Sequence, residues 1–343
     1  MRLPSLSLIA LSLLSASSYA VENGTPVDWQ QYNDAVRLEN PTGGNCTATL
    51  IAGHYAITAG HCLEETGIDR LITNDGSTIS LSNQWISPEY TDEYGRRAKD
   101  VGIVRVDSPV DYRHIQFLNI DEQSEGEPMV IRGFGGTIDT LNQADFTFSH
   151  YNYADLYYVY ADTVNESHTT GGDSGAAWTI NKDGNEEIIA IHRGSAHFTT
   201  GERETYGTTI QSVQDFITET IDGWHYPTLA DTDTDGKATI TIQSLHRDDV
   251  VDTAWGDNVI ITGGTCLDGL IKPFDKCTYD IESDGTQGEL YLTDNEVIHI
   301  NKPIENTGGG DGGNNNTDND DSGGSMGFWP LLLLGIATLR RKR

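Results

Sequence analysis

Three side chains suited to nucleophilic catalysis lie far apart along the chain, in the order histidine, aspartate and serine. His61 stands among small residues in TAGHC, Asp100 precedes the apolar run VGIVRV, and Ser174 lies in the glycine-rich segment GGDSGA. A serine hydroxyl is a weak nucleophile that needs an adjacent base. An imidazole base in turn needs a carboxylate that fixes its tautomer and stabilises its charged form. The three segments together predict a serine nucleophile, a histidine base and an orienting aspartate.

The order of these residues argues against one large class of serine hydrolases. In α/β-hydrolases the serine comes first and the histidine last, and the serine lies in a G-x-S-x-G motif. Here the serine comes last, and Ala176 replaces the final glycine of that motif. The glycines around Ser174 would let backbone N–H groups turn toward an oxyanion. An esterase of the α/β-hydrolase type is therefore not expected.

The elements that must position these residues are short strands and one helix. Between about residue 21 and residue 225, short apolar runs are separated by Gly, Asn and Asp, namely AVRLE, TATLIAG, YAITA, DVGIVRV, MVIRGF and EIIAIHRG. Many short strands at short spacing are typical of an all-β barrel or sandwich. Apolar residues then recur at helical spacing just before Gly223, at Ile210, Val213, Phe216, Ile217 and Ile221. This pattern predicts a final helix after the strands.

Over residues 21–225 these segments resemble the chymotrypsin/trypsin family of serine endopeptidases. Gly133-Phe134-Gly135 is similar to the Gly-Trp-Gly turn of that family, and Tyr206 with the helix from about 211 is similar to its C-terminal end. The resemblance implies an all-β, chymotrypsin-like fold of two six-stranded β-barrels with a C-terminal helix. It places the active site between the two barrels.

The resemblance also implies roles for named residues. His61 would be the general base, Asp100 its orienting partner and Ser174 the nucleophile. The N–H groups of Gly172 and Ser174 would form the oxyanion hole. The family needs no cofactor and no metal for this chemistry, so none is expected here.

The segment beginning at Val21 is similar to the start of mature family members. In that family the freed α-amino group pairs with the aspartate before the nucleophile, which is Asp173 here. The chain has four cysteines, an even number that is expected to pair outside the cytosol. The resemblance implies a bridge between Cys46 and Cys62, beside His61. Cys266 and Cys277 would then close a short loop.

The expected specificity pocket departs from that of trypsin. His168 occupies the position at which trypsin-like enzymes carry an aspartate, and His192-Arg193-Gly194 replaces the usual Ser-Trp-Gly. Thr169-Thr170-Gly171-Gly172 and Ile191-His192-Arg193-Gly194 resemble segments of glutamyl endopeptidases, in which a histidine at this place helps to bind an acidic side chain. Glu204 aligns with a position in the pocket wall, where it could attract Lys or Arg or neutralise His168. We expect an acidic or neutral preference, with a basic preference as the alternative.

The two ends of the chain resemble targeting segments. Residues 1–20 contain one arginine, an apolar run and a small-residue end, which are features of a secretory signal peptide. Residues 323–343 combine Gly323-Gly324-Ser325, a short apolar run and four basic residues, and they resemble the GlyGly-CTERM tail of Gram-negative bacteria. That resemblance implies export by type II secretion, removal of the tail by a rhombosortase, and a location at the cell surface or outside the cell. The membrane would be contacted only through this tail.

Two further regions complete the expected domain organisation of 1–20, 21–227, 228–303, 304–322 and 323–343. Residues 228–303 contain five or six strand-like runs, which predict a small Ig-like β-sandwich. Residues 304–322 are rich in Gly, Asn and Asp and are expected to form a linker. Asp231, Asp233 and Asp235 resemble the front of a calcium loop, but Ile242 stands where an EF-hand needs glutamate. A solvated turn is the alternative that we favour.

The charge of the chain restricts its partners. It has 343 residues with 52 acidic and 21 basic side chains, which give a net charge of −31. Such a charge repels nucleic acids and anionic membranes. The sequence therefore predicts a secreted or surface-attached serine endopeptidase that acts on proteins or peptides. The alternative is a non-catalytic binding or adhesion protein on the same fold.

Overall fold

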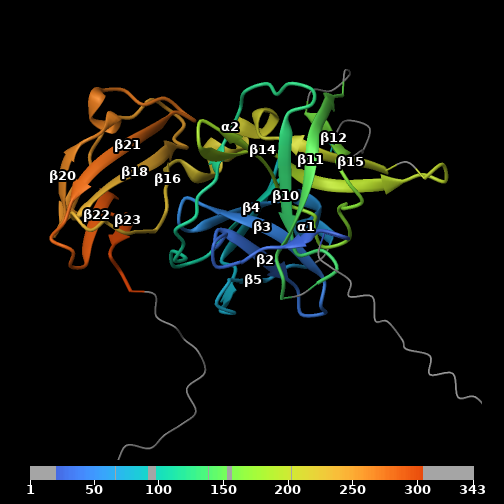
Figure 1. Ribbon diagram of the computed structural model, residues 1–343, viewed down its shortest axis with the longest axis horizontal. Coiled ribbons are helices and arrows are strands. Elements are labelled where there is room, and N and C mark those ends of the chain that lie inside the picture. Colours follow the sequence, from blue (N-terminus) through green and yellow to red (C-terminus); the bar gives the residue numbers. More distant parts are fainter. Residues whose placement is uncertain are drawn as a thin grey trace, which may run out of the picture. The chain divides into compact units, whose positions relative to one another are not determined.

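The computed structural model describes residues 21–65, 67–91, 98–137, 139–152, 157–201 and 203–303. The expected signal peptide, the expected linker after residue 303 and the expected tail lie outside these ranges. Within them, no helix has the length and apolar character needed to cross a membrane. The described chain is mostly β-structure (Figure 1).

Seven strands form the first sheet, and they are β2 (Ala35–Glu39), β3 (Asn45–Ile51), β4 (Tyr55–Thr58), β5 (Arg70–Ile72), β6 (Thr78–Ser80), β7 (Asn83–Ile86) and β8 (Gly102–Arg105). Their order across the sheet is β6-β5-β2-β3-β4-β8-β7. The two end strands do not pair with each other in the described part of the chain. Both are short and largely exposed, so their outer edges can be hydrated. The first unit is therefore an open half-barrel, which differs from the closed six-stranded barrel that we expected.

Eight strands form the second sheet, and they are β1 (Thr25–Pro26), β9 (Phe117–Leu118), β10 (Pro128–Gly133), β11 (Asn142–Tyr151), β12 (Tyr158–Thr163), β13 (Ala177–Lys182), β14 (Asn185–His197) and β15 (Arg203–Thr209). The path β11-β10-β13-β14-β15-β12 is closed by pairing of β12 with β11. This closure forms the six-stranded barrel that was expected. β1 extends it at β11, and β9 pairs in parallel with β14.

Strand β14 contains a β-bulge at the point where it passes the site. In the pairing of β14 with β15, His192 lies opposite Gly207 and Gly194 lies opposite Tyr206, so Arg193 is the extra residue. A bulge bends a strand and redirects the side chain of the inserted residue.

Two short helices and a 3₁₀ turn complete the barrels, namely α1 (Gly60–Glu65), η1 (Gln211–Val213) and α2 (Gln214–Ile221). The helix that was expected near 210–221 is thus divided into η1 and α2. We expected Gly223 just past its end, but the left-handed residue there is Asp222, with φ 44°. Its backbone N–H donates to the carbonyl oxygen of Thr218, which ends the helix with a hydrogen bond.

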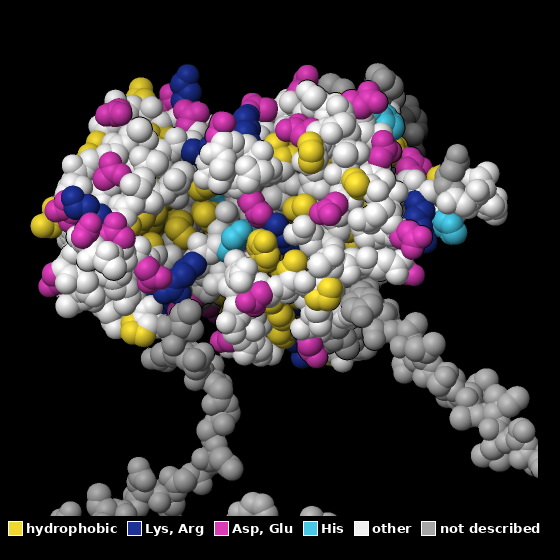
Figure 2. Space-filling view, viewed as in Figure 1, with side chains coloured by type: hydrophobic (Ala, Val, Ile, Leu, Met, Phe, Trp, Pro, Cys, Tyr) yellow, Lys and Arg dark blue, Asp and Glu magenta, His cyan; other side chains and the backbone are white. Residues whose placement is uncertain are grey.

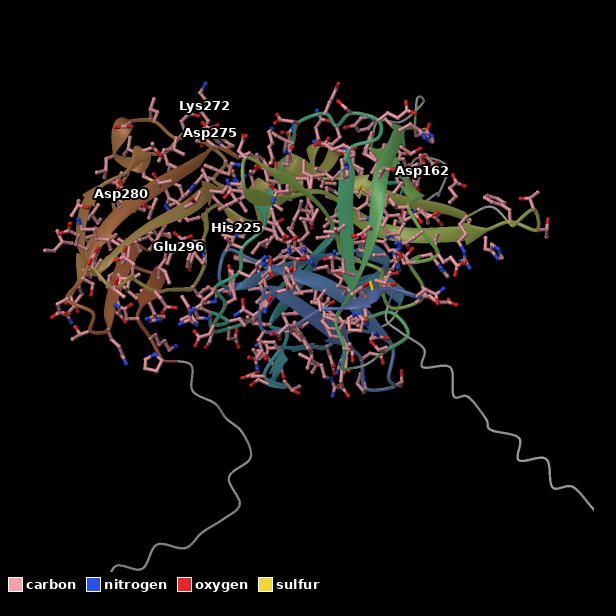
Figure 3. All side chains as sticks on the ribbon, in the orientation of Figure 1. Asp162, His225, Lys272, Asp275, Asp280 and Glu296 are labelled. Atoms are coloured by element: carbon pink, nitrogen blue, oxygen red, sulfur yellow. A yellow bond between two sulfur atoms is a disulfide. The ribbon has the colours of Figure 1, made fainter. Side chains whose placement is uncertain are left out.

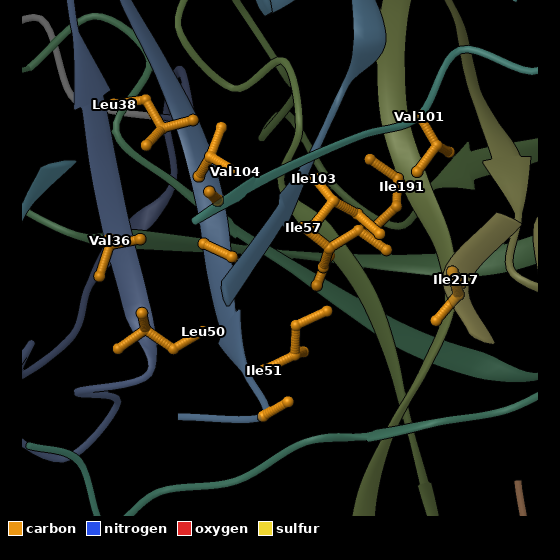
Figure 4. Packing of buried hydrophobic residues seen from close by; sticks show 14 of the residues in the cluster. Val36, Leu38, Leu50, Ile51, Ile57, Val101, Ile103, Val104, Ile191 and Ile217 are labelled. Atoms are coloured by element: carbon orange, nitrogen blue, oxygen red, sulfur yellow. The ribbon is translucent and has the colours of Figure 1, made fainter. Parts of the chain in front are cut away.

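The largest apolar core joins the first sheet to the second (Figure 4). Leu38, Leu50 and Ile57 come from the first sheet, whereas Ile191 comes from β14 and Ile217 from α2. Burial of each such side chain contributes about 1.5–3 kcal/mol to folding. Because candidate residues lie on both sheets, this shared core fixes their separation. Acidic side chains are distributed over the outer face that Figure 2 shows.

The chain after α2 forms two four-stranded sheets and a short 3₁₀ turn, η2 (Thr265–Asp268). The strands are β16 (Trp224–His225), β17 (Leu229–Ala230), β18 (Lys237–Ser244), β19 (Trp255–Asp257), β20 (Ile260–Gly263), β21 (Lys276–Glu282), β22 (Gly288–Thr293) and β23 (Glu296–Ile300). Their orders are β16-β18-β21-β20 and β17-β23-β22-β19. Ile242, Tyr279, Leu290 and Ile298 are buried in a core of their own between these sheets.

Buried hydrogen bonds connect these later strands to the barrels. Nδ1 of His225, labelled in Figure 3, accepts the backbone N–H of Ala52 at 3.1 Å, and its Nε2 donates to the carbonyl oxygen of Gln116 at 2.9 Å. Gln243 accepts the N–H of Leu118 at 2.9 Å and donates to its carbonyl oxygen at 2.7 Å. Burial lowers the pKa of His225 to about 4, so its neutral ring can hold both contacts.

Candidate active site

The partly exposed His61 and the buried Asp100 form a doubly hydrogen-bonded pair. His61 lies in the first turn of α1, and Asp100 precedes β8. The backbone N–H of His61 donates to Oδ1 of Asp100 at 2.8 Å, and its Nδ1 donates to Oδ2 at 2.8 Å. Asp100 is fully buried. A carboxylate can only accept, so the proton between the two side chains lies on Nδ1 and leaves Nε2 as an acceptor.

Ser174 is held near this pair by β3. Cys46 of β3 forms a disulfide with Cys62, the residue after His61. The next residue, Thr47, donates its backbone N–H to the carbonyl oxygen of Ser174 at 2.9 Å. Adjacent residues of one strand therefore anchor both catalytic candidates. In the part of the chain that the structure describes, the Ser174 hydroxyl forms no hydrogen bond with His61. Catalytic hydrogen bonds often tighten only when substrate binds.

The turn that carries Ser174 depends on glycine. Gly172 has φ 104° and Gly175 has φ 87°, conformations that other residues rarely adopt. A Cβ on Gly172 would lie 2.9 Å from the side chain of Asn45. The carbonyl oxygen of Gly172 accepts the Thr47 hydroxyl at 2.9 Å. Within the described ranges the N–H groups of Gly172 and Ser174 donate to no backbone acceptor, so both remain available to a ligand.

Asp173 faces away from the cavity and into the protein. Its carboxylate is fully buried and accepts the N–H groups of Gly135 and Thr170, both at 2.8 Å. The backbone N–H of Val21 also donates to it. Burial nevertheless raises the pKa of Asp173 to about 6, because the loss of hydration outweighs the N–H groups of Thr170, Gly135 and Val21. Val21 itself is fully buried. The contact seen here is made by its amide N–H, so the pairing of a freed α-amino group with Asp173 stays a prediction.

A cavity of about 340 Å³ opens beside Ser174. Its lining is polar and includes Glu22, His168, Thr169, Thr170, Gly171, His192, Gly194, Ser195, His197 and Arg203. Nε2 of His168 lies 3.1 Å from a carboxylate oxygen of Glu22, and its Nδ1 lies 3.0 Å from the carbonyl oxygen of Glu166. His168 is therefore part of the wall, as the sequence predicts, but it has an acidic partner there.

Three of the five predicted pocket residues line this cavity, and two do not. His168, His192 and Gly194 belong to the lining, whereas Arg193 and Glu204 are absent from it. Burial lowers the pKa of His192 to about 3, and its Nδ1 accepts a long hydrogen bond of 3.4 Å from the indole N–H of Trp178. His192 thus stays neutral near pH 7 and supplies shape and polarity rather than charge.

Sequence reasoning missed Glu22, His197 and Arg203 as lining residues. Glu22 directly follows the expected mature N-terminus at Val21, and this was the one available signal. His197 and Arg203 lie opposite each other at the ends of β14 and β15, so only the strand register places them at the cavity. The same register puts Glu204 opposite Ala196 and off the lining.

The aspartates of residues 231–235, which resemble the front of a calcium loop, form ion pairs and hydrogen bonds with other protein groups. The carboxylate of Asp231 pairs with Arg113 at 2.8 Å. Oδ1 of Asp233 accepts the N–H groups of Asp235 and Lys237, both at 2.9 Å. In the described part of the chain, no group of three or more His, Cys, Asp or Glu side chains is placed to hold a metal ion. The segment has the geometry of a turn.

Comparison with known proteins agrees with this arrangement. Residues 22–217 match the family model described as trypsin. The venom plasminogen activator Haly-PA of Gloydius brevicauda is 28% identical over 154 residues, which are 43% of this chain and 58% of that protein. A trypsin of Saccharopolyspora erythraea is 26% identical over 137 residues, which are 36% of this chain and 60% of that protein. The chain thus spans less than two thirds of the length of these curated relatives.

A solved structure shows the same fold. Neuropsin, a serine protease expressed in the limbic system of mouse brain, superposes with a TM-score of 0.50 at 18% identity, and the match covers 58% of this chain and 99% of neuropsin. The two disulfides also form as predicted, Cys46–Cys62 and Cys266–Cys277. Because the family model matches more than half of the chain and includes the segments of His61, Asp100 and Ser174, the chain belongs to the trypsin family.

Proposed function

We propose that this protein is a serine endopeptidase that hydrolyses peptide bonds through an acyl-enzyme on Ser174. The His61–Asp100 pair, tied to Ser174 through Cys46 and Thr47, carries this proposal. Nε2 of His61 takes the hydroxyl proton as Ser174 attacks the carbonyl carbon, and it then gives that proton to the leaving amine. Asp100 stabilises the imidazolium that exists between the two steps. Water then releases the acyl group by the same route in reverse.

The N–H groups of Gly172 and Ser174 form the oxyanion hole in this proposal. The positive φ of Gly172 and the absence of another backbone acceptor for either N–H support the assignment. The developing negative charge on the carbonyl oxygen is stabilised by donors that are already oriented, which commonly is worth about 100-fold to 1,000-fold in rate per donor. No cofactor is needed for any of these steps.

Cleavage before Val21 completes the site. In the intact chain, Asp173 receives only an amide N–H from Val21. Cleavage after residue 20 converts that amide into an α-ammonium group, which would pair with the buried carboxylate and hold the turn at Ser174. The burial of both residues supports this pairing. A buried carboxylate with a cationic partner is far better compensated than one with amides alone.

The cavity favours an acidic or neutral side chain before the scissile bond. His168, His197 and Arg203 supply basic side chains there, whereas Glu22 is the one carboxylate among the described lining residues and faces His168. A substrate carboxylate would therefore meet more cationic than anionic groups. The rival preference for Lys or Arg would require Glu204, which the cavity lining does not include.

The domain limits and the location follow from the same proposal. Residues 21–227 form the protease and residues 228–303 a β-sandwich that contacts it, while residues 304–322 link them to a processed tail. We propose export from a Gram-negative bacterium by type II secretion, with a rhombosortase-like enzyme acting on residues 323–343. Intact mass of the mature protein tests the processing, because it should begin at Val21 and end near Ser325.

Hydrolysis of a peptide library by the purified mature protein tests the function. Wild-type protein should cleave internal peptide bonds, with Glu or neutral residues enriched before the bond. The Ser174→Ala variant should lose about a million-fold in kcat while keeping its fold. Absence of cleavage by well-folded wild type would instead favour the non-catalytic binding protein.

A further inference from the structure

Arg193 is the inserted residue of the β-bulge in β14, and its side chain leaves the cavity. The bulge lies between His192 and Gly194, both of which line the cavity beside Ser174. A regular strand would alternate faces and keep its register, whereas the extra residue allows Arg193 to point elsewhere. Its side chain is mostly buried, with 15% exposed.

The buried guanidinium lies between two tyrosine rings and the catalytic carboxylate. Its carbon atom Cζ is 4.5 Å from the ring centre of Tyr158 and 5.8 Å from that of Tyr206. Its Nε is 3.6 Å from Oδ2 of Asp100. Stacking on aromatic faces restrains a planar guanidinium without removing its charge. Arg193 is thus held as a fixed positive charge beside Asp100.

Oδ2 of Asp100 faces both Arg193 and His61. The same oxygen accepts Nδ1–H of His61 at 2.8 Å. Asp100 has no exposed surface, so water screens these interactions little. A guanidinium beside the carboxylate cancels part of the field that would stabilise a protonated His61, and it also repels the imidazolium directly.

We propose that Arg193 is a positioning residue of the catalytic apparatus, which acts through Asp100 to disfavour protonation of His61 and so keeps the base functional in more acidic solution. This inference rests on the proposed peptidase function. It deepens that function, because it assigns to Arg193 a role in the pH range of the reaction rather than in substrate selection.

Among the residues that the structure describes, the other charged or titratable groups around His61 do not supply this effect. His192 faces His61 from β14, but its low pKa keeps it neutral between pH 5 and pH 8. Tyr90 faces Asp100 from the loop after β7 and interacts with Glu64 of α1, and burial raises its pKa so that it also stays neutral. Glu64 and Asp100 are negative and favour the imidazolium. Among these described groups, Arg193 is therefore the positive charge that opposes protonation of His61.

The rate of labelling by a small fluorophosphonate tests the inference without depending on the substrate pocket. The reagent reacts with a serine that a neutral histidine activates, so the rate should fall with acidification as His61 is protonated. In Arg193→Gln the midpoint of this fall should move to higher pH by about 0.5 to 1 unit, because one unit corresponds to a tenfold change in protonation equilibrium. Arg193→Lys, which keeps the charge, should move it less.

Matched controls separate charge from packing. Arg105→Gln removes the same charge from the far end of β8, where Arg105 lies 6.0 Å from the ring centre of Tyr55, and should leave the midpoint unchanged. If Arg193 only packed, Arg193→Gln would lower labelling at every pH without moving the midpoint. An unchanged or lowered midpoint in folded Arg193→Gln overturns the inference. Wild type that is never labelled would instead reject the proposed peptidase function.

Discussion

Glu22 and His168 connect the segment that begins at Val21 to the wall of the cavity beside Ser174. Their side chains are 3.1 Å apart, and their backbones form an antiparallel bridge in which the N–H of His168 donates to the carbonyl oxygen of Glu22 at 2.9 Å. Glu22 is thus the one carboxylate among the described residues of the cavity lining. Under the proposed cleavage before Val21, the residue after the new N-terminus would form part of the cavity wall.

Removal of this carboxylate should strengthen binding of acidic side chains. In Glu22→Gln, His168 loses its acidic partner and a substrate carboxylate loses a like charge that repels it. Because the Glu22 side chain is 55% exposed, the pair is worth about 0.5–1 kcal/mol. The ratio of kcat/KM after Glu to that after Gln should rise about twofold to fivefold. Glu219→Gln, a control on the exposed face of α2, should leave this ratio at its wild-type value. If Glu22→Gln also left the ratio at the wild-type value, Glu22 would not contribute to substrate selection.

Processing before Val21 should change how stability depends on pH. In a chain that retains residue 20, the pKa of Asp173 is raised to about 6 in the folded state, from an ordinary value of 3.8. The folded state then binds the proton more tightly than the unfolded state does, so the free energy of unfolding falls as pH rises from about 4 through about 6. The loss should be about 2–3 kcal/mol.

Urea unfolding of two Ser174→Ala proteins measures this difference. One protein begins at Val21 and the other keeps one preceding residue. The free energy of unfolding of the first protein should fall much less above pH 6, because its α-ammonium group pairs with Asp173. In Asp173→Asn the two forms should become similar. Equal pH profiles of the two forms with Asp173 intact would contradict the pairing.

The two disulfides should differ in their effect on catalysis although both stabilise the fold. Each closes a short loop, of 16 and 11 residues, and each should contribute about 2–4 kcal/mol. Replacement of Cys46 and Cys62 by Ala should also slow serine labelling, because this bridge ties His61 to the strand that holds Ser174. Replacement of Cys266 and Cys277 should leave the labelling rate near that of wild type. The paired measurements of unfolding free energy and labelling rate distinguish the two bridges.

Gln243 should stabilise the protease although it lies outside residues 21–227. Its side chain occupies both the N–H and the carbonyl oxygen of Leu118 and also donates to the carbonyl oxygen of Phe274 at 3.0 Å. Gln243→Ala would leave buried polar groups without partners, at a cost of about 1–3 kcal/mol. Thermal unfolding should show one transition that moves to lower temperature. A second domain that unfolds separately, with the protease transition unmoved, would show that these contacts contribute nothing.

Sequence patterns could predict the local parts of this site well. The segments around His61, Asp100 and Ser174 can each be identified from a few neighbouring residues. The glycines around Ser174 indicate a tight turn that directs backbone N–H groups toward an oxyanion. The Cys46–Cys62 bridge and the closed barrel were implied by the resemblance to the chymotrypsin/trypsin family. These features depend on contacts within segments or on a pattern common to the family.

Other features depend on register and packing between distant segments, which no short pattern encodes. Glu22 and His168 meet through a bridge between residues far apart in the chain. Arg193 points to Asp100 because of a bulge, and His192 is neutral because it is buried against Trp178. The open first sheet reflects two exposed end strands that were not distinguishable from pairing ones.

Mapping of fluorophosphonate adducts by mass spectrometry tests the central claim most directly. Mature wild-type protein should gain one adduct per molecule, on the peptide that contains Ser174. Ser174→Ala should gain none, and His61→Ala should be labelled far more slowly because it lacks the base. Folded wild-type protein that begins at Val21 and remains unlabelled near pH 8, or that carries its adduct on another residue, would contradict the account.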